Sequence, residues 1–180
     1  MKAMLTPTQT VGPFFHDCLL RSDICGNALA VPDEDAAVIR VHGFVYDGDG
    51  VGVPDAMIEW WQTSAKEKLS VFGRAGTAVD GSYELTTAYP ASIPSVGDVR
   101  QSPHLSLAIF ARGLLNHLLT RVYLPNDAST AADPILSRVP VTRRSTLIAR
   151  EESPAVNGDR VYRFDVVLQG PGETVFLDFK

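Results

Sequence analysis

One histidine begins a stretch whose residue types and spacing are those of a possible metal-binding strand. His104 opens the sequence HLSLAIFAR, in which polar and apolar residues alternate as in a half-buried strand. Side chains two residues apart lie on one face of a strand, so a second ligand would come from position 106, which is Ser106. The remaining histidines do not cluster in sequence. The pattern alone therefore favours a hydrogen-bonded structural role for His104 over a ligand role.

An arginine ends the same stretch. Arg112 follows a mainly apolar run and precedes Gly113. A guanidinium at the mouth of a strand can pair with a carboxylate through two hydrogen bonds. A solvated charge or a structural ion pair is the more common role for such a residue, and the sequence pattern leaves these alternatives open.

A Gly-Pro pair lies in the N-terminal segment TQTVGPFF, residues 8–15. Proline fixes the backbone direction, and glycine leaves room for a close approach of the backbone to another group. The segment around Thr10, Gly12 and Pro13 could approach a ligand or pack on a partner chain, and the residues alone do not separate the two.

Composition and missing motifs narrow the function. The chain has 180 residues and a net charge of −5, which argues against a general nucleic-acid binder. Cys18 and Cys25 do not form a C-x-x-C pair, so we expect no zinc site and no disulfide framework. No nucleophile elbow, P-loop or dinucleotide fingerprint occurs. Without a signal peptide or a long apolar run, we expect a cytoplasmic protein without a membrane partner.

Short strands separated by Gly and Pro predict a mainly β protein, a β-sandwich with an extended N-terminal arm and little helix. The arm is expected over residues 1–35 and the sandwich domain over residues 36–180. A short helix is expected near residues 133–139, with irregular backbone over residues 142–149. The predicted strands lie at residues 37–47, 56–62, 82–89, 104–112, 114–124, 160–169 and 174–180.

Several motifs together resemble a known family. The segments TPTQTVGPFFH, VYDGDG, IEWWQ, FGR, DGSYEL, PHLSLAIFARG, TRVYLPND and LQGPGETVFLDF are similar to those of the α chains of protocatechuate 3,4-dioxygenases. This is an intradiol ring-cleaving family built from related α and β chains, and the resemblance runs from about residue 6 to residue 180. It implies a β-sandwich core with extended arms.

The resemblance also implies where iron binds. In that family the β chain holds a non-haem Fe(III) with two tyrosines and two histidines. The first tyrosine corresponds here to Leu69, and the H-x-H histidines correspond to His104 and Ser106. Tyr89 lies in the region of the second tyrosine, but its surroundings do not match, so it is not expected to be a ligand. We therefore expect no metal and no catalytic residue in this chain.

The same resemblance implies a function for the chain as a subunit. The enzyme opens 3,4-dihydroxybenzoate with O2 to give 3-carboxy-cis,cis-muconate, and the iron-bearing β subunit would be the partner in a hetero-oligomer. Thr10, Gly12 and Pro13 would line the substrate cavity, Arg112 would lie near the substrate carboxylate, and Phe14 stands where the family often has tyrosine. Two other interpretations remain: a self-sufficient dioxygenase with an unfamiliar ligand set, and a non-catalytic β-sandwich that binds aromatic molecules or other proteins.

Overall fold

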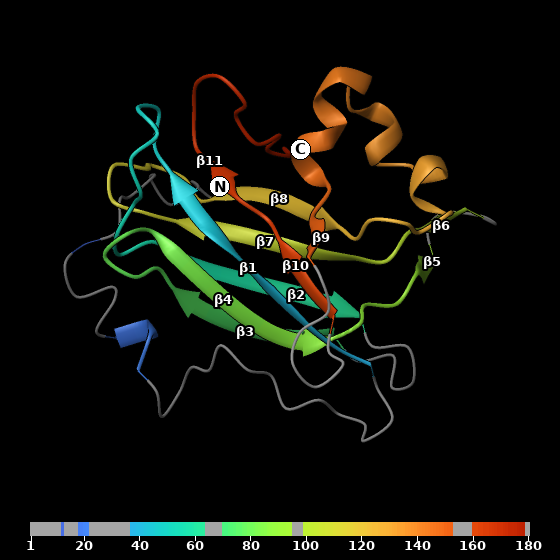
Figure 1. Cartoon of the computed structure of the whole chain (residues 1–180), viewed down its shortest axis with the longest axis horizontal. Helices are drawn as coiled ribbons and strands as arrows, with labels where there is room; N and C mark the ends of the chain where they lie inside the picture. Colours follow the sequence, from blue (N-terminus) through green and yellow to red (C-terminus); the bar gives the residue numbers. More distant parts are fainter. Residues whose placement is uncertain are drawn as a thin grey trace, which may run out of the picture.

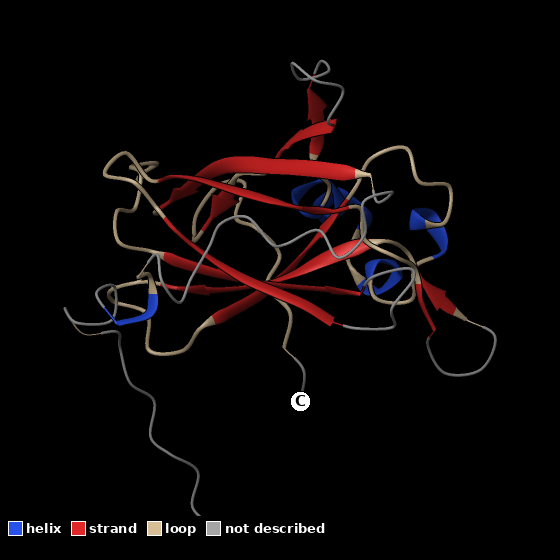
Figure 2. Cartoon of the chain, turned by 90° about the horizontal axis from the view of Figure 1, so that it is seen from below, coloured by secondary structure: helices blue, strands red, loops and turns tan. Residues whose placement is uncertain are grey.

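The structure is a computed structural model that describes residues 12, 18–21, 37–63, 70–94, 99–152 and 160–178. Within these residues it is a mainly β protein in which two sheets pack face to face (Figures 1 and 2). The predicted arm lies almost wholly outside the described residues, so the division into arm and sandwich stays a prediction.

The first sheet is built around β1, whose alternating pattern buries every second residue. The strand order across the sheet is β4, β1, then β10 and β11 in succession, then β9. β1 is antiparallel to β4 and parallel to β10 and β11. The strand bounds are β1 Val38–Tyr46, β4 Ser82–Ala88, β9 Arg150–Glu152, β10 Arg160–Arg163 and β11 Val166–Val167.

Gly43 explains why β10 and β11 are two short strands rather than one. A Cβ atom at this position would lie 1.9 Å from the carbonyl oxygen of Phe164, so only glycine lets the chain pass. The amide of Phe44 is bound by the side chain of Asp165 instead of by a strand neighbour. The ladder therefore breaks at residues 164–165, inside the single strand that the sequence predicts.

The second sheet has the order β3, β2, β7, β8, and all its pairs are antiparallel. A separate short pair, β5 with β6, directly precedes β7 in the chain. The bounds are β2 Met57–Thr63, β3 Ser70–Gly76, β5 Ile93–Pro94, β6 Arg100–Gln101, β7 His104–Phe110 and β8 Leu118–Tyr123.

The sequence pattern does not predict β3, because SVFGRAG does not alternate and contains two glycines. The structure shows why glycine is tolerated there. A Cβ atom at Gly73 would lie 2.3 Å from the ring of Trp60, which is fully buried. The indole of β2 fills the space that a side chain on β3 would take, so packing replaces the usual pattern.

Two predictions for the last third of the chain are corrected. Residues 142–149 are not irregular, because η3 (Val141–Leu147) is a 3-10 helix that follows η1 (Thr130–Ala132) and η2 (Leu136–Arg138). Residues 174–178 are not a strand. Their backbone hydrogen bonds are divided among several elements, with Thr174 bound to β11, Val175 to η3 and Leu177 to β8, so no ladder forms.

The main core lies between the two sheets. Apolar side chains from β1, β4 and β10 meet those from β2, β7 and β8, and they are almost fully buried. A second, smaller cluster packs η2 and η3 against Tyr123 at the end of β8. The 3-10 helices therefore lie at the end of the sandwich where β7 begins (Figure 1).

Candidate functional site

The two faces of β7 differ in character. Leu105, Leu107 and Ile109 point into the core between the sheets. His104 and Ser106 lie on the opposite face, as the alternation predicts. We call these two residues the degenerate ligand pair, because they stand two apart on one face of a strand and only one of them is an imidazole.

His104 has the orientation of a metal-binding histidine. Its side chain is buried, and its Nδ1 lies 2.7 Å from the carbonyl oxygen of Ser102. A carbonyl can only accept, so Nδ1 donates and the lone pair of the neutral ring is on Nε2. Burial, with the positive charge of Arg121 as a further cause, lowers the pKa of His104 to about 4. The ring is therefore neutral near pH 7.

Ser106 faces a buried arginine. In the register of β7 with β8, Ser106 pairs with Arg121, and on its other side it pairs with Trp61 of β2. Arg121 is only 8% exposed. Directly paired residues of an antiparallel sheet have Cβ atoms about 5 Å apart, so the arginine stem starts beside the serine. No local pattern in the sequence selects Arg121, because its position depends on this register.

The guanidinium of Arg121 is poorly neutralised by the described residues. Its Nη1 donates one long hydrogen bond of 3.4 Å to the hydroxyl of Tyr123. Its Nε is buried and has no hydrogen-bond partner among the residues that the structure describes. Tyr123 in turn donates to Asp133 at 2.9 Å, which links the arginine to a carboxylate only indirectly.

Asp133 joins the start of β7 to the 3-10 helices. Burial by itself would raise the pKa of Asp133, but hydrogen bonds to its carboxylate hold the pKa below the usual value. The donors are the amides of Leu136, Ser102 and Ile135 and the hydroxyl of Tyr123. Its negative charge is therefore stabilised mainly by fixed N–H and O–H groups, so Asp133 is a structural centre and not a free carboxylate.

The residues near the degenerate ligand pair do not fit a ferric ion. One imidazole is present, the second ligand position is a serine, and a positive charge lies across from it. Within the described residues no three or more His, Cys, Asp or Glu side chains gather into a possible metal site. A single imidazole beside a guanidinium cannot hold iron against water.

Leu69 and Tyr89 stand at or near the positions of the two tyrosine ligands in the related β chains. Leu69 lies outside the described residues. Tyr89 is partly buried against the main core. Burial is the main cause that raises its pKa, and electrostatic interactions with Tyr162 and Asp127 raise the pKa further. Its further electrostatic neighbours belong to β9 and β10, in the other sheet from His104. That Tyr89 is not a metal ligand stays a prediction.

Arg112 lies at the opposite end of β7. Its Nη2 is 3.2 Å from the Oδ2 of Asp55, and both side chains are open to solvent, 65% and 53% exposed. Asp55 precedes β2 in a left-handed backbone conformation with φ 60°. Arg112 stands six positions after Ser106 and two beyond the end of β7, so an extended chain would place the two on the order of 20 Å apart. Arg112 therefore cannot serve a ligand bound at the degenerate ligand pair.

Of the N-terminal residues expected to line the cavity, only Gly12 is among the described residues. Thr10, Pro13 and Phe14 lie outside the described residues. Gly12 is described and exposed, and a Cβ atom there would have no neighbour within 4 Å. The cavity-lining role of Thr10, Gly12 and Pro13 stays a prediction.

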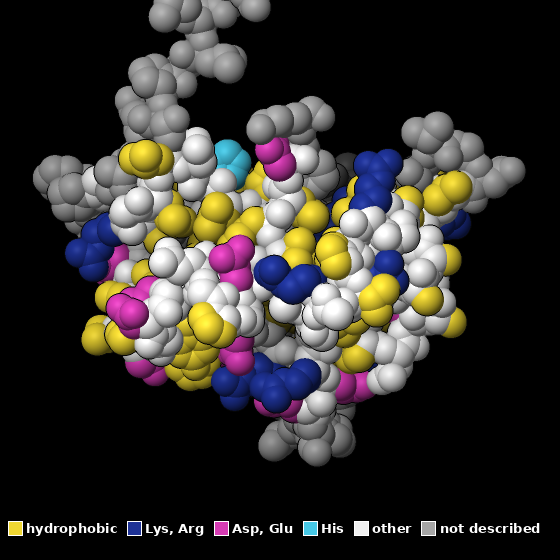
Figure 3. All heavy atoms as spheres, turned by 90° about the horizontal axis from the view of Figure 1, so that it is seen from above, with side chains coloured by type: hydrophobic (Ala, Val, Ile, Leu, Met, Phe, Trp, Pro, Cys, Tyr) yellow, Lys and Arg dark blue, Asp and Glu magenta, His cyan; other side chains and the backbone are white. Residues whose placement is uncertain are grey.

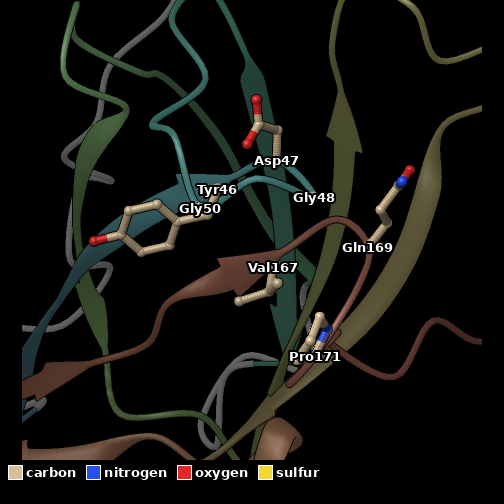
Figure 4. A pocket seen from close by; sticks show the side chains of 7 residues that line it. All are labelled: Tyr46, Asp47, Gly48, Gly50, Val167, Gln169 and Pro171. Carbon is tan, nitrogen blue, oxygen red and sulfur yellow. The ribbon is translucent and has the colours of Figure 1, made fainter.

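A groove of about 230 Å³ lies beyond the end of β1 (Figure 4). Tyr46 and Asp47 line it from the end of β1, and Val167, Gln169 and Pro171 line it from β11 and the following turn. Asp47 is the only charged side chain lining it, and its Oδ1 already accepts hydrogen bonds from the amides of Asp49 and Val51. The groove offers no convergent set of polar groups for catalysis.

The surface shows mixed charge. On the face seen in Figure 3, basic side chains form separate small groups among acidic and apolar ones. This arrangement differs from the continuous basic face of a nucleic-acid binder. Among the described helices, none is long and apolar enough to span a membrane.

Comparisons with known proteins agree with the resemblance seen in the sequence. Residues 12–170 match the family described as Dioxygenase. The chain is 37% identical to the protocatechuate 3,4-dioxygenase alpha chain of Burkholderia cepacia, over 96% of both chains. It is also 37% identical to the alpha chain from Pseudomonas putida, over 97% of this chain and 96% of the relative. The beta chain from Burkholderia cepacia is 27% identical over 92% of this chain and 76% of its own length.

Solved structures show the same fold. The dioxygenase domain of a carbohydrate-binding fusion protein from Streptomyces sp. SirexAA-E superposes with a TM-score of 0.64 at 23% identity, over 92% of this chain and 98% of that chain. The 3-chlorocatechol 1,2-dioxygenase from Rhodococcus opacus 1CP superposes with a TM-score of 0.63 at 20% identity, over 78% of this chain and 63% of that chain. The family match over most of the chain and the 37% identity to two relatives over nearly its whole length show that the chain belongs to the intradiol dioxygenase family.

Proposed function

We propose that this chain is the non-iron α-type subunit of a ring-cleaving dioxygenase that acts on 3,4-dihydroxybenzoate. One observation carries the proposal. The chain has an exposed guanidinium able to bind a carboxylate, Arg112, but it lies far along β7 from the chain's own degenerate ligand pair. An arginine in this place is too far from the degenerate ligand pair to act with it, which supports a role in a site completed by another chain.

The partner in this proposal is a β-type chain that holds the Fe(III). Alpha and beta relatives both match this chain over most of its length, which supports an assembly of related chains. The ferric ion, when bound in the β-type chain, supplies the binding of the catecholate and its activation toward O2. The product is 3-carboxy-cis,cis-muconate, in which both atoms of O2 are incorporated into the opened ring.

This chain contributes binding and orientation. Arg112 supplies a positive charge with two parallel N–H groups, which match the two oxygens of the substrate carboxylate. The segment with Thr10, Gly12 and Pro13 forms part of the cavity wall, where glycine lets the backbone approach the substrate. Fixing the carboxylate orients the two hydroxyl groups toward the partner's iron, which lowers the entropic cost of reaching the reactive geometry.

Co-expression with a β-type chain tests the proposal. We expect the purified complex to contain one iron per αβ unit and to consume O2 with 3,4-dihydroxybenzoate. The isolated chain should contain no stoichiometric iron and show no turnover. Stoichiometric Fe(III) with turnover in the isolated chain would instead support a self-sufficient dioxygenase. A complex that binds the substrate without consuming O2 would support a non-catalytic binding module.

A further inference from the structure

A neutral imidazole and a positive guanidinium meet on the outer face of the second sheet. His104 has the tautomer and orientation of a ligand, because Nδ1 donates to the carbonyl of Ser102. Ser106 stands where a second ligand on this face would be, and Arg121 lies directly across the strand pair from it. The position where a second ligand would stand therefore lies beside a positive charge in this chain.

Among the described residues, the positive charge of Arg121 has no direct carboxylate partner, in contrast to that of Arg74. On the same face of the sheet, Arg74 forms a direct ion pair with Glu59, at 2.6 Å from Nε to Oε1. Arg121 has no such carboxylate within the described residues, and its buried Nε has no partner there. Burying a charge without a direct counter-ion costs stability, so the described residues alone do not account for an arginine at this position.

We propose that Arg121 excludes metal ions from the degenerate ligand pair, because its guanidinium holds a positive charge close to the place of a bound cation. The Nη1 of Arg121 is 3.4 Å from the hydroxyl of Tyr123, whose ring centroid lies 5.7 Å from that of His104, so the charge is close to the ligand positions. In a partly buried site, a positive charge roughly 6–10 Å away repels a divalent ion strongly enough to weaken its binding by at least about a hundredfold.

The proposal goes beyond the loss of ligands. A missing ligand alone would leave a weak site that one substitution could restore. An opposing positive charge keeps the position free of metal even when a second ligand is supplied. In an assembly with iron-bearing chains, such a charge would direct the metal to the partner and away from this chain. The proposal concerns metal affinity and needs no activity, so it can fail independently of the proposed function.

The test restores the second ligand with and without the charge. Three variants of the full-length chain, co-expressed with a β-type chain, are compared: S106H, S106H/R121Q and S106H/R121K. The R121Q substitution keeps a donor for Tyr123 but removes the charge, whereas R121K keeps the charge. Binding of Ni²⁺ is measured by equilibrium dialysis with elemental analysis, which separates the probe from the partner's iron.

We expect S106H and S106H/R121K to bind Ni²⁺ no better than the wild-type complex, and S106H/R121Q to bind it at least about a hundredfold more tightly. The variant R40Q is a matched control, because Arg40 lies on β1 in the other sheet and its loss should not change Ni²⁺ binding. Equal affinities of S106H and S106H/R121Q would overturn the proposal, as would tight binding by S106H/R121K.

A second measurement applies if the double variant does not fold. R121Q alone keeps His104 as one available ligand, so it should bind more Ni²⁺ than the wild-type complex at millimolar probe concentrations. Circular dichroism and oligomer size confirm that this single variant is folded and assembled. Equal Ni²⁺ binding by folded R121Q and wild-type complexes would overturn the proposal.

Discussion

Replacing Arg112 with alanine should weaken the reaction with 3,4-dihydroxybenzoate while leaving the fold intact. The guanidinium is 65% exposed and makes one described ion pair, at 3.2 Å to Asp55. An exposed pair of this kind contributes at most about 1 kcal/mol to stability, so unfolding should change little. A charge-assisted hydrogen bond to a substrate carboxylate is stronger, about 1.5–3 kcal/mol. Its loss should lower kcat/KM by about ten- to a hundredfold.

The assay is steady-state O2 uptake by the complex with two substrates. Catechol has no carboxylate, so R112A should affect it much less than 3,4-dihydroxybenzoate. R112K should recover only part of the activity, because an ammonium cannot form two parallel hydrogen bonds. An equal proportional loss on both substrates would refute the reasoning, because it would mean that Arg112 supports the interface or a loop.

Asp55 provides a matched control for the same prediction. D55N removes the negative charge next to Arg112 and keeps a side chain of similar size. Since the pair is exposed on both sides, kcat/KM should change by less than about threefold. A loss as large as that of R112A would show that Arg112 acts only when Asp55 holds it in place.

Three further outcomes follow from the structure. G73A should destabilise the chain by about 1–3 kcal/mol in urea unfolding, because its Cβ atom would clash with Trp60, whereas G12A should not. The low pKa of His104 means that the unfolded chain binds its proton first as the pH falls. The neutral His104 therefore contributes fully to the free energy of unfolding above about pH 6.5, and this contribution, up to about 3 kcal/mol, is lost as the pH falls toward about 4. The free energy of unfolding of H104Q should depend less on pH over this range. Deleting residues through Pro13 should reduce turnover more than stability, and wild-type kinetics in the assembled truncation would show that the segment is only a tail.

The sequence predicts the elements whose side chains alternate. Residues 37–47 alternate cleanly, and β1 lies at nearly the predicted bounds. β3 escapes prediction because its conformation depends on Trp60 of another strand. The strand predicted over residues 174–180 is wrong over its described part, because the backbone hydrogen bonds of residues 174–178 are divided among several elements and do not follow one neighbour.

In the candidate site, too, residues placed by local alternation can be predicted, and residues placed by contacts between distant segments cannot. Ser106 can be selected from its spacing to His104, since side-chain alternation is a local property. Arg121 cannot, because it faces Ser106 only through the register of β7 with β8. Asp55 also escapes prediction, since its contact with Arg112 joins two segments that are distant in sequence.

β1 meets its neighbours at very different times during synthesis. β4 is translated soon after it and can pair with one edge, but the other edge pairs with β10 and β11, where Ile39 meets Arg160 and Val45 meets Val166. Until those last residues leave the ribosome, an alternating strand presents an open edge that other nascent chains can pair with. Such distant parallel pairing also forms slowly. The yield of soluble protein should therefore depend on how quickly residues 160–167 dock on β1 after they leave the ribosome.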